Sequence, residues 1–274
     1  MTTNGDLNSS TTVLGESILS CQDIHKSFLG VKAVNGATFD VPKGMITALI
    51  GPNGAGKTTV VNILSGAMKS DSGRMQIGSV DVTNWENYKI ARMGLMRTFQ
   101  LSRELGGLTV LENLLAAPKA QSGESLFNIF FRPGRVRREE RRNIERAMEI
   151  LRTYGLYELR DSRARELSGG QKKLLEISRG VMASPTLLLL DEPMAGVNPA
   201  LIERIGGYIL DLKHEGVTIL MIEHNLNVVE KICDNVIVLA EGRTLATGRL
   251  SELRANPEVV QAYLGEIINA NPHS

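Results

Sequence analysis

The stretch Gly51-Pro-Asn-Gly-Ala-Gly-Lys57-Thr58-Thr59 fits the pattern G-x-x-x-x-G-K-[ST] of a phosphate-binding loop. Its glycines let the backbone curl so that successive N–H groups converge on phosphate oxygens, and the start of a following helix also attracts anions. Residues 45–50 form an apolar run typical of a strand, and residues 58–68 have the apolar spacing of a helix. This context favours a nucleotide phosphate site over an ordinary glycine-rich turn.

The side chains of the loop suggest separate roles in binding a nucleotide. Lys57 can reach the β- and γ-phosphates, and the Thr58 hydroxyl can bind Mg²⁺. We expect ATP to be held by the whole loop, which comprises Gly51, Pro52, Asn53, Gly54, Ala55, Gly56, Lys57, Thr58 and Thr59.

A second motif, Leu187-Leu-Leu-Leu-Asp191-Glu192, places two carboxylates directly after an apolar run. A strand that is apolar on both faces belongs in the middle of a parallel sheet, and its carboxyl end lies at the edge where nucleotides bind. Asp191 would hold Mg²⁺, directly or through water, and Glu192 would be the general base that polarises the attacking water. Taken alone, the motif is as well explained by a strand end before the turn at Pro193, so this interpretation depends on the phosphate loop.

Composition and charge make some classes of partner less expected. The chain has 274 residues, enough for one large domain or two modest ones, and its 31 basic and 30 acidic residues leave a net charge of +1. This balance gives no electrostatic reason to expect nucleic acid as the main partner. No run approaches the roughly 18–20 apolar residues of a membrane-spanning helix, so a membrane role would require separate subunits.

The two cysteines, Cys21 and Cys233, are far apart and lie outside any Cys-x-x-Cys or Cys/His cluster. We therefore expect no zinc site and a reduced protein, although a single bridge between them stays open. Residues 1–16 are rich in Thr, Ser, Asn and Gly, which predicts a disordered tail and not a signal peptide.

The centre of the chain differs from its flanks. Residues 108–159 read as mostly helical, and the segment 132–146 contains seven arginines and three glutamates. Ile144, Ala147, Met148 and Leu151 follow helical spacing, which predicts one buried stripe. We interpret this part as an α-helical subdomain inserted into an α/β core. Its arginine-rich stretch is most simply a solvated helix face, and contact with anionic lipid headgroups is the alternative.

On both sides of this insertion the pattern is that of strands alternating with helices. The expected strands and helices are strands 18–26 and 37–41, helix 171–182, strand 186–190, helix 199–215, strand 217–222, and two short strands with a terminal helix within 236–265.

The motif Leu167-Ser168-Gly169-Gly170-Gln171 has two interpretations from its chemistry alone, an anion-binding helix start and an ordinary helix capped by Ser168. Together with the phosphate loop and the Asp-Glu strand end, it resembles the signature of the ATP-binding cassette (ABC) ATPases. The resemblance covers about residues 19–265. It implies an α/β fold of the P-loop NTPase (RecA-like) type, with a mostly parallel sheet, an N-terminal antiparallel β subdomain and an inserted α-helical subdomain.

The same resemblance implies a domain organisation. The ABC ATPase domain would span 17–266, with its core in 17–99 and 167–245, and its helical subdomain at about 100–166. A C-terminal extension would follow at 246–266, and a flexible tail at 267–274.

Further site residues are implied by the family motifs. Gln100, in Arg97-Thr-Phe-Gln100, would contact Mg²⁺ and the attacking water, and His224 would contact the γ-phosphate. With Lys57 and Glu192 these residues would form the catalytic set. Phe28 would stack on the adenine ring, although an apolar core position fits it almost as well.

The resemblance also implies partners. Two cassettes, identical or different, would enclose two ATP molecules, so that Ser168, Gly169, Gly170 and Gln171 of one chain complete the site of the other. ATP would close this dimer and its hydrolysis would open it. The movement would reach two transmembrane permease subunits at the cytoplasmic face of the membrane and, indirectly, a solute-binding protein.

Several features are similar to those of ATPases from branched-chain amino-acid importers (LivG type). They are Met194-Ala-Gly-Val-Asn198-Pro199, Leu108-Thr-Val-Leu-Glu-Asn113, the arginine-rich segment 131–146, Ile222-Glu-His224 and the tail 256–266. Asn198 replaces the aspartate that most cassettes carry there, which puts in doubt the usual coupling between the two sites. Urea-type importers and lipopolysaccharide-type exporters share parts of this pattern.

Two classes outside transport were also weighed. A cassette ATPase of DNA repair or translation usually has a long coiled-coil insertion or two cassettes in one chain, and neither is evident here. A GTPase would need a guanine-reading Asn-Lys-x-Asp motif, which does not occur in the sequence.

Overall fold

The computed structural model describes residues 16–98, 105–118 and 133–262 of the chain. The predicted site residue Gln100 and nearly all of the predicted terminal tails lie outside these ranges, as do the segments 99–104 and 119–132.

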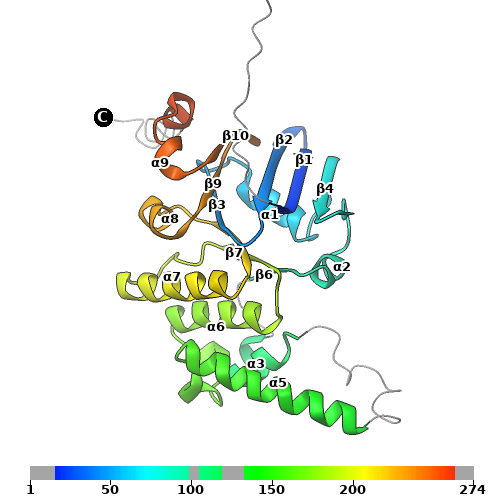
Figure 1. The fold of residues 1–274 in the computed structure, drawn as a ribbon, viewed down its shortest axis with the longest axis vertical. Coiled ribbons are helices and arrows are strands. Elements are labelled where there is room, and N and C mark those ends of the chain that lie inside the picture. Colours follow the sequence, from blue (N-terminus) through cyan, green and yellow to red (C-terminus); the bar gives the residue numbers. More distant parts are fainter. Residues whose placement is uncertain (1–15, 99–104, 119–132, 263–274) are drawn as a thin grey trace, which may run out of the picture.

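Two β-sheets form the frame of the structure (Figure 1). The first is antiparallel, with the strand order β2-β1-β4-β5, and the second has the order β10-β9-β3-β8-β7-β6. In the second sheet all neighbours are parallel except β9 and β10. The strand bounds are β1 Ser17–Phe28, β2 Val31–Pro42, β3 Ile46–Ile50, β4 Ser72–Ile77, β5 Val80–Asp81, β6 Leu95–Arg97, β7 Leu187–Asp191, β8 Thr218–Ile222, β9 Asn235–Ala240 and β10 Arg243–Gly248. This architecture confirms the predicted α/β fold class.

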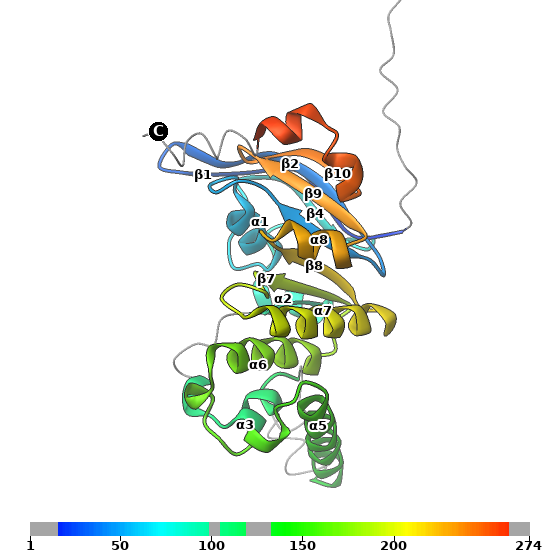
Figure 2. The same cartoon turned by 90° about the vertical axis from the view of Figure 1, so that its left-hand side faces the viewer.

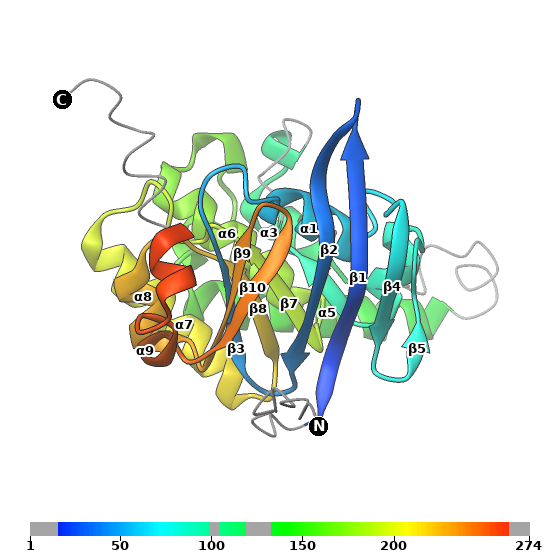
Figure 3. The same ribbon diagram turned by 90° about the horizontal axis from the view of Figure 1, so that it is seen from above.

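Helices cover the mostly parallel sheet on both faces. α1 lies between the two sheets, whereas α6 and α7 pack against the opposite face and separate it from α3 and α5 (Figures 1 and 2). Figure 3 shows the antiparallel sheet and β10 from above. The α-helices are α1 Lys57–Leu64, α2 Asn87–Arg92, α3 Val110–Leu115, α5 Pro133–Thr153, α6 Gly169–Met182, α7 Pro199–His214, α8 Leu226–Ile232 and α9 Leu250–Leu253, and the short 3₁₀ turns are Leu105–Gly107, Tyr157–Leu159 and Ala164–Glu166.

The strands of the mostly parallel sheet contribute side chains to two separate hydrophobic cores, one on each face of the sheet. In β7, Leu188 and Leu190 pack with the helical side of the molecule, while Leu187 and Leu189 pack with α1 and the antiparallel sheet. Alternate residues of a strand point to opposite faces, so a strand buried on both faces must be apolar throughout. This explains the continuous leucine run and confirms its predicted place inside a parallel sheet.

The hairpin of β1 and β2 is longer than its sequence predicts. Phe28 pairs with Val31, so the turn has only two residues, Leu29 and Gly30. Both have positive φ, 46° and 87°, as the tight hairpin turns that match strand twist require. Leucine is an unusual residue in such a conformation, and the turn therefore carried no recognisable sequence signal.

α1 ends at Leu64, within two residues of Gly66, near which the sequence predicts that the helix stops. Gly66 has φ +69°, a left-handed conformation that stops the helix. A Cβ atom on Gly66 would lie 2.8 Å from the backbone of Trp85 and Asn87, so only glycine allows the chain to pass this close.

The buried side of α5 differs in part from the predicted stripe. Ala147 and Leu151 are buried as expected, but Ile144 is 42% exposed. Ile150, near the C-terminal end of the helix, is also buried, as is Tyr154 directly after it. Packing against α3 and α6 therefore involves mainly the second half of α5, and the arginine-rich first half is largely exposed.

The two cysteines are free thiols that belong to different cores. Burial raises the pKa of Cys233 to about 12, and it also raises that of Cys21. The alternative of a bridge between them is thus wrong. Among the described helices, none is long and apolar enough to cross a membrane.

Replacing Leu151 with Ala should lower the free energy of unfolding by about 3 kcal/mol, because it leaves a cavity where α5 packs on its neighbours. Ile144→Ala, on the same helix, is the matched control and should cost less than about 0.5 kcal/mol. Urea denaturation followed by circular dichroism measures both. Equal losses would contradict the orientation of α5.

Candidate functional site

The carboxyl ends of β3, β7 and β8 meet at one edge of the parallel sheet. The segments that leave these strands carry the phosphate loop, the pair Asp191–Glu192 and the pair Glu223–His224. A pocket of about 240 Å³ lies there, at the start of α1. It is lined by Ala33, Asn53, Gly54, Ala55, Gly56, Lys57, Thr58, Thr59, Glu192 and His224.

The structure thus brings most of the predicted phosphate loop together with two predicted catalytic residues, Glu192 and His224. Ala33, on β2, also lines the pocket and was not predicted. Gly56 has φ +95° and a Cβ atom there would lie 2.4 Å from the Ala33 carbonyl oxygen, so the loop and β2 approach each other at a distance only glycine permits.

Lys57 is buried and holds its ammonium group against the loop itself. Nζ donates hydrogen bonds to the carbonyl oxygens of Gly51 at 2.7 Å and Pro52 at 2.8 Å. These two contacts curl the loop around the start of α1, whose first N–H groups have no partner within the helix. A positive side chain and a positive helix end at one pocket form a site for an anion such as phosphate.

Glu192 and His224 are in direct contact across the pocket. His224 Nε2 lies 3.0 Å from Glu192 Oε1, and both side chains are about half exposed. Glu192 has φ +48°, a conformation that is rare for a residue with a side chain. Its backbone N–H donates to the carbonyl oxygen of Ile222 at 3.2 Å, so the end of β8 supports the strained residue.

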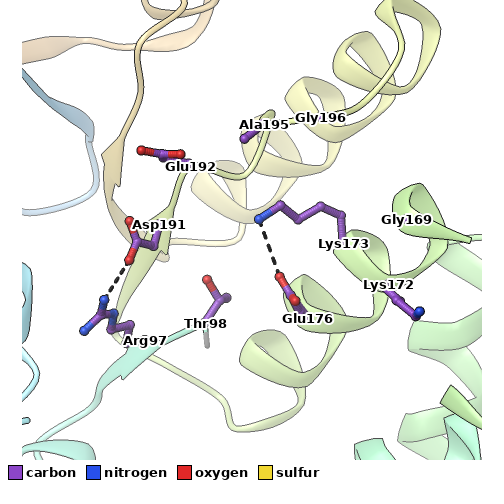
Figure 4. A pocket seen from close by; sticks show the side chains of 10 residues that line it. All are labelled: Arg97, Thr98, Gly169, Lys172, Lys173, Glu176, Asp191, Glu192, Ala195 and Gly196. Atoms are coloured by element: carbon purple, nitrogen blue, oxygen red, sulfur yellow. Dashed lines mark hydrogen bonds and ion pairs between the residues drawn. The ribbon is translucent and has the colours of Figure 1, made fainter. Parts of the chain in front are cut away.

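Asp191 is held by a residue that sequence analysis did not place in the site. Arg97, at the end of β6, donates from Nη2 to Asp191 Oδ2 at 2.6 Å. The pair lies on a larger hollow of about 640 Å³ that separates Asp191 and Glu192 from the start of α6 (Figure 4). The motif Arg97-Thr-Phe-Gln100 contained this arginine, but nothing local indicated its partner.

Glu223 is a second site residue that the sequence did not reveal. It is buried, and Oε2 accepts a hydrogen bond from the backbone N–H of His224 at 2.9 Å. Burial raises the pKa of Glu223, while the backbone N–H groups of His224, Asn225 and Met194 oppose this shift. The buried carboxylate therefore holds the backbone of His224 behind the pocket.

The signature residues do not line the pocket at α1 of their own chain. Ser168 caps α6: its hydroxyl accepts from the Gln171 backbone N–H at 3.3 Å, and Gln171 Oε1 accepts from the Ser168 N–H at 2.8 Å. Gly169 instead borders the larger hollow in Figure 4. The helix start is thus capped by its own side chains and lies outside the pocket at α1.

Asn198 caps a helix, a role that asparagine can fill in place of aspartate. It is the N-cap of α7, and its Oδ1 accepts from the Leu201 N–H at 2.9 Å, with Pro199 as the first helical residue. Asparagine and aspartate cap helices about equally well.

Phe28 is 43% exposed at the end of β1, which argues against the alternative of a core position. It does not line the pocket at α1, and Lys26 Nζ lies 5.7 Å from the centre of its ring. Gln100 lies outside the described residues.

The arrangement of strands, phosphate loop and acidic strand end defines a P-loop nucleoside triphosphatase. A sequence model of the ABC transporter family matches residues 34–195. The chain belongs to this family, as an ATP-binding and ATP-hydrolysing cassette.

Relatives support the assignment along nearly the whole chain. The "Probable branched-chain amino acid transport ATP-binding protein LivG" of Archaeoglobus fulgidus is 44% identical and covers 90% of this chain and 95% of its own length. The protein of the same name from Methanocaldococcus jannaschii is 41% identical, covering 91% and 98%. The solved ADP conformation of an ATP-binding cassette of an ABC transporter has a TM-score of 0.77 at 40% identity, covering 91% of this chain and 99% of that one.

Removing the Glu223 carboxylate should destabilise the fold around His224, whose backbone N–H it accepts from. Glu223→Ala leaves the His224 backbone N–H without its acceptor and opens a cavity at a buried position, and should lower the free energy of unfolding by about 2–3 kcal/mol. Glu223→Gln keeps an acceptor oxygen and should cost less than about 1 kcal/mol at pH 7. Thermal melting of the two variants beside the wild type measures the difference, and equal losses would argue against this role.

The same pair of proteins tests the raised pKa. Because the folded-state pKa of Glu223 lies above its unfolded value, the folded wild type binds more protons between the two values, and rising pH destabilises it there. Glu223→Gln lacks this contribution. The unfolding free energy of the variant relative to wild type should therefore rise with pH through this window and level off above it, whereas a difference independent of pH would contradict the shift.

Proposed function

We propose that this chain hydrolyses ATP at the pocket beside α1 and thereby drives the import of branched-chain amino acids. The observation that carries the proposal is the convergence of Lys57, Glu192 and His224 on one pocket at the start of α1. A phosphate-binding element and a candidate base thus face the same space, as phosphoryl transfer to water requires.

The nucleotide would be bound mainly by the loop. Backbone N–H groups of residues 53–59 would hold the β- and γ-phosphates, and Lys57 would exchange its two carbonyl partners for phosphate oxygens. The exposed Phe28 would stack on the adenine ring.

Glu192 would act as the base. It would accept a proton from a water molecule whose oxygen bonds to the γ-phosphorus, while the bond from that phosphorus to the β–γ bridging oxygen breaks. His224 contacts Glu192 at 3.0 Å and would orient it and contact the γ-phosphate. Lys57 would stabilise the negative charge that develops on the phosphate oxygens.

The residues present also suit Mg²⁺, which prefers oxygen ligands. The Thr58 side chain is exposed at the pocket, and Asp191 Oδ1 accepts no hydrogen bond from any described residue. Thr58, Asp191 and Gln100 would hold the ion, whose charge would neutralise part of that on the phosphates.

A second cassette would complete each site. The start of α6, with Ser168, Gly169, Gly170 and Gln171, does not line the pocket of its own chain, and its first N–H groups suit an anion. We infer that it meets the γ-phosphate bound by the partner, in a homo- or heterodimer. Two permease subunits would hold this dimer at the cytoplasmic face of the membrane, and a solute-binding protein would deliver the amino acid.

The base assignment is tested by Glu192→Gln. The variant should bind ATP as tightly as wild type but hydrolyse it about 10²–10⁴-fold more slowly, because the amide cannot accept the proton. Bound ATP should also hold two chains together, which size-exclusion chromatography detects.

Glu203→Gln is a matched control, since Glu203 is an exposed carboxylate on α7 that pairs with Lys231. It should leave turnover unchanged. ATP turnover near the wild-type rate in Glu192→Gln would contradict the assignment of Glu192 as the general base.

The cargo is tested in cells from which the gene for this chain is deleted. Uptake of labelled leucine, isoleucine and valine should fall, and should return with the wild-type chain but not with Glu192→Gln. Glutamate uptake serves as the control. Normal leucine uptake together with lost urea uptake would assign the chain to a urea-type importer instead.

A further inference from the structure

Arg97 links three parts of the site from a position near the end of the sheet. Nη2 donates to Asp191 Oδ2 at 2.6 Å, and Nη1 donates to Asn62 Oδ1 at 2.7 Å and to Ser65 Oγ at 3.4 Å. The arginine side chain is only 9% exposed. One guanidinium group thus joins the far end of α1 to the carboxylate at the end of β7.

The charges around the phosphate loop are compensated within the chain. Asp191 and Glu192 are adjacent carboxylates and would together attract a cation. Arg97 neutralises the first, and His224 contacts the second. The other oxygen of Asp191 points away from Arg97 (Figure 4).

We propose that Arg97 is a positioning residue that makes divalent-metal binding at Asp191 depend on bound nucleotide. The proposal rests on the proposed function, in which Asp191 helps to hold Mg²⁺. In the nucleotide-free chain, the guanidinium cancels the charge of Asp191 and repels a second cation. The same hydrogen bond fixes Oδ2, so that Oδ1 stays available to an ion that arrives with the phosphates.

The phosphates of ATP reverse this balance, because they bring several negative charges to the start of α1. Without Arg97, the carboxylate would keep its full charge even when no nucleotide is bound. A unit charge at a few ångströms, at an effective dielectric constant of about 20, changes cation affinity by well over tenfold. Loss of the arginine should therefore create a metal site in the empty protein.

The test is a titration of the nucleotide-free full-length chain with Mn²⁺, in which electron paramagnetic resonance measures the free ion. Wild type should bind Mn²⁺ weakly, and at least tenfold more tightly in the presence of ATP, after the Mn²⁺ that ATP binds by itself, measured without protein, is subtracted. Arg97→Met should bind Mn²⁺ at least tenfold more tightly than wild type without nucleotide. Arg74→Met is the matched control, because it breaks the exposed ion pair with Asp81 on the antiparallel sheet, and it should match wild type.

Arg97→Lys separates charge from position. This variant keeps the positive charge, so its affinity for Mn²⁺ without nucleotide should be as weak as that of wild type. A lysine cannot donate to Asp191 and Asn62 in the fork geometry of arginine, so ATP turnover should fall. If Arg97 had only a structural role, Arg97→Lys would not lower ATP turnover while leaving the Mn²⁺ affinity of the nucleotide-free chain unchanged.

Two results would overturn the proposal. One is unchanged Mn²⁺ affinity in folded, nucleotide-free Arg97→Met. The other needs no variant: wild type that binds Mn²⁺ equally well with and without ATP. If the wild type does not hydrolyse ATP at all, the proposed function fails; if it does and either of these results is found, only the role of Arg97 fails.

Discussion

Lys57 curls the phosphate loop by placing its ammonium group on the carbonyl oxygens of Gly51 and Pro52, and the rest of the site is arranged around that contact. The loop can close so tightly only because Gly56 passes β2 at a distance that excludes a side chain. The curl leaves the first N–H groups of α1 facing a pocket. The parallel sheet then delivers the ends of β7 and β8 to the same edge, where Glu192 and His224 complete the lining.

Three charged groups at this edge already have partners in the chain. Lys57 contacts carbonyl oxygens, Asp191 contacts Arg97, and Glu192 contacts His224. Binding of ATP would thus exchange partners within a preformed site and would not need to build one. Such exchanges give a physical route by which the nucleotide state reaches Arg97, and with it the strand β6.

The parts that could be predicted from the sequence are those with a local signal. Glycine spacing revealed the loop, the leucine run revealed β7, and the cap residue Ser168 marked a helix start. The roles of Arg97 and Glu223 have no such signal. Arg97 meets Asp191 across 94 positions of sequence, and the burial of the Glu223 carboxylate is set by tertiary packing. Ile144 fits the helical period of α5 but is exposed, whereas Ala147 and Leu151 are buried in the part of α5 that packs against α3 and α6. Periodicity alone could not predict where along the helix this packing ends.

The most direct test of this account is a crystal structure of the Glu192→Gln variant with ATP and Mg²⁺. The account predicts the γ-phosphate at the start of α1, with Lys57 Nζ moved from the carbonyl oxygens of Gly51 and Pro52 to phosphate oxygens and with residue 192 and His224 facing the γ-phosphate. A nucleotide bound elsewhere, or a filled pocket in which Lys57 still contacts those carbonyl oxygens, would contradict it.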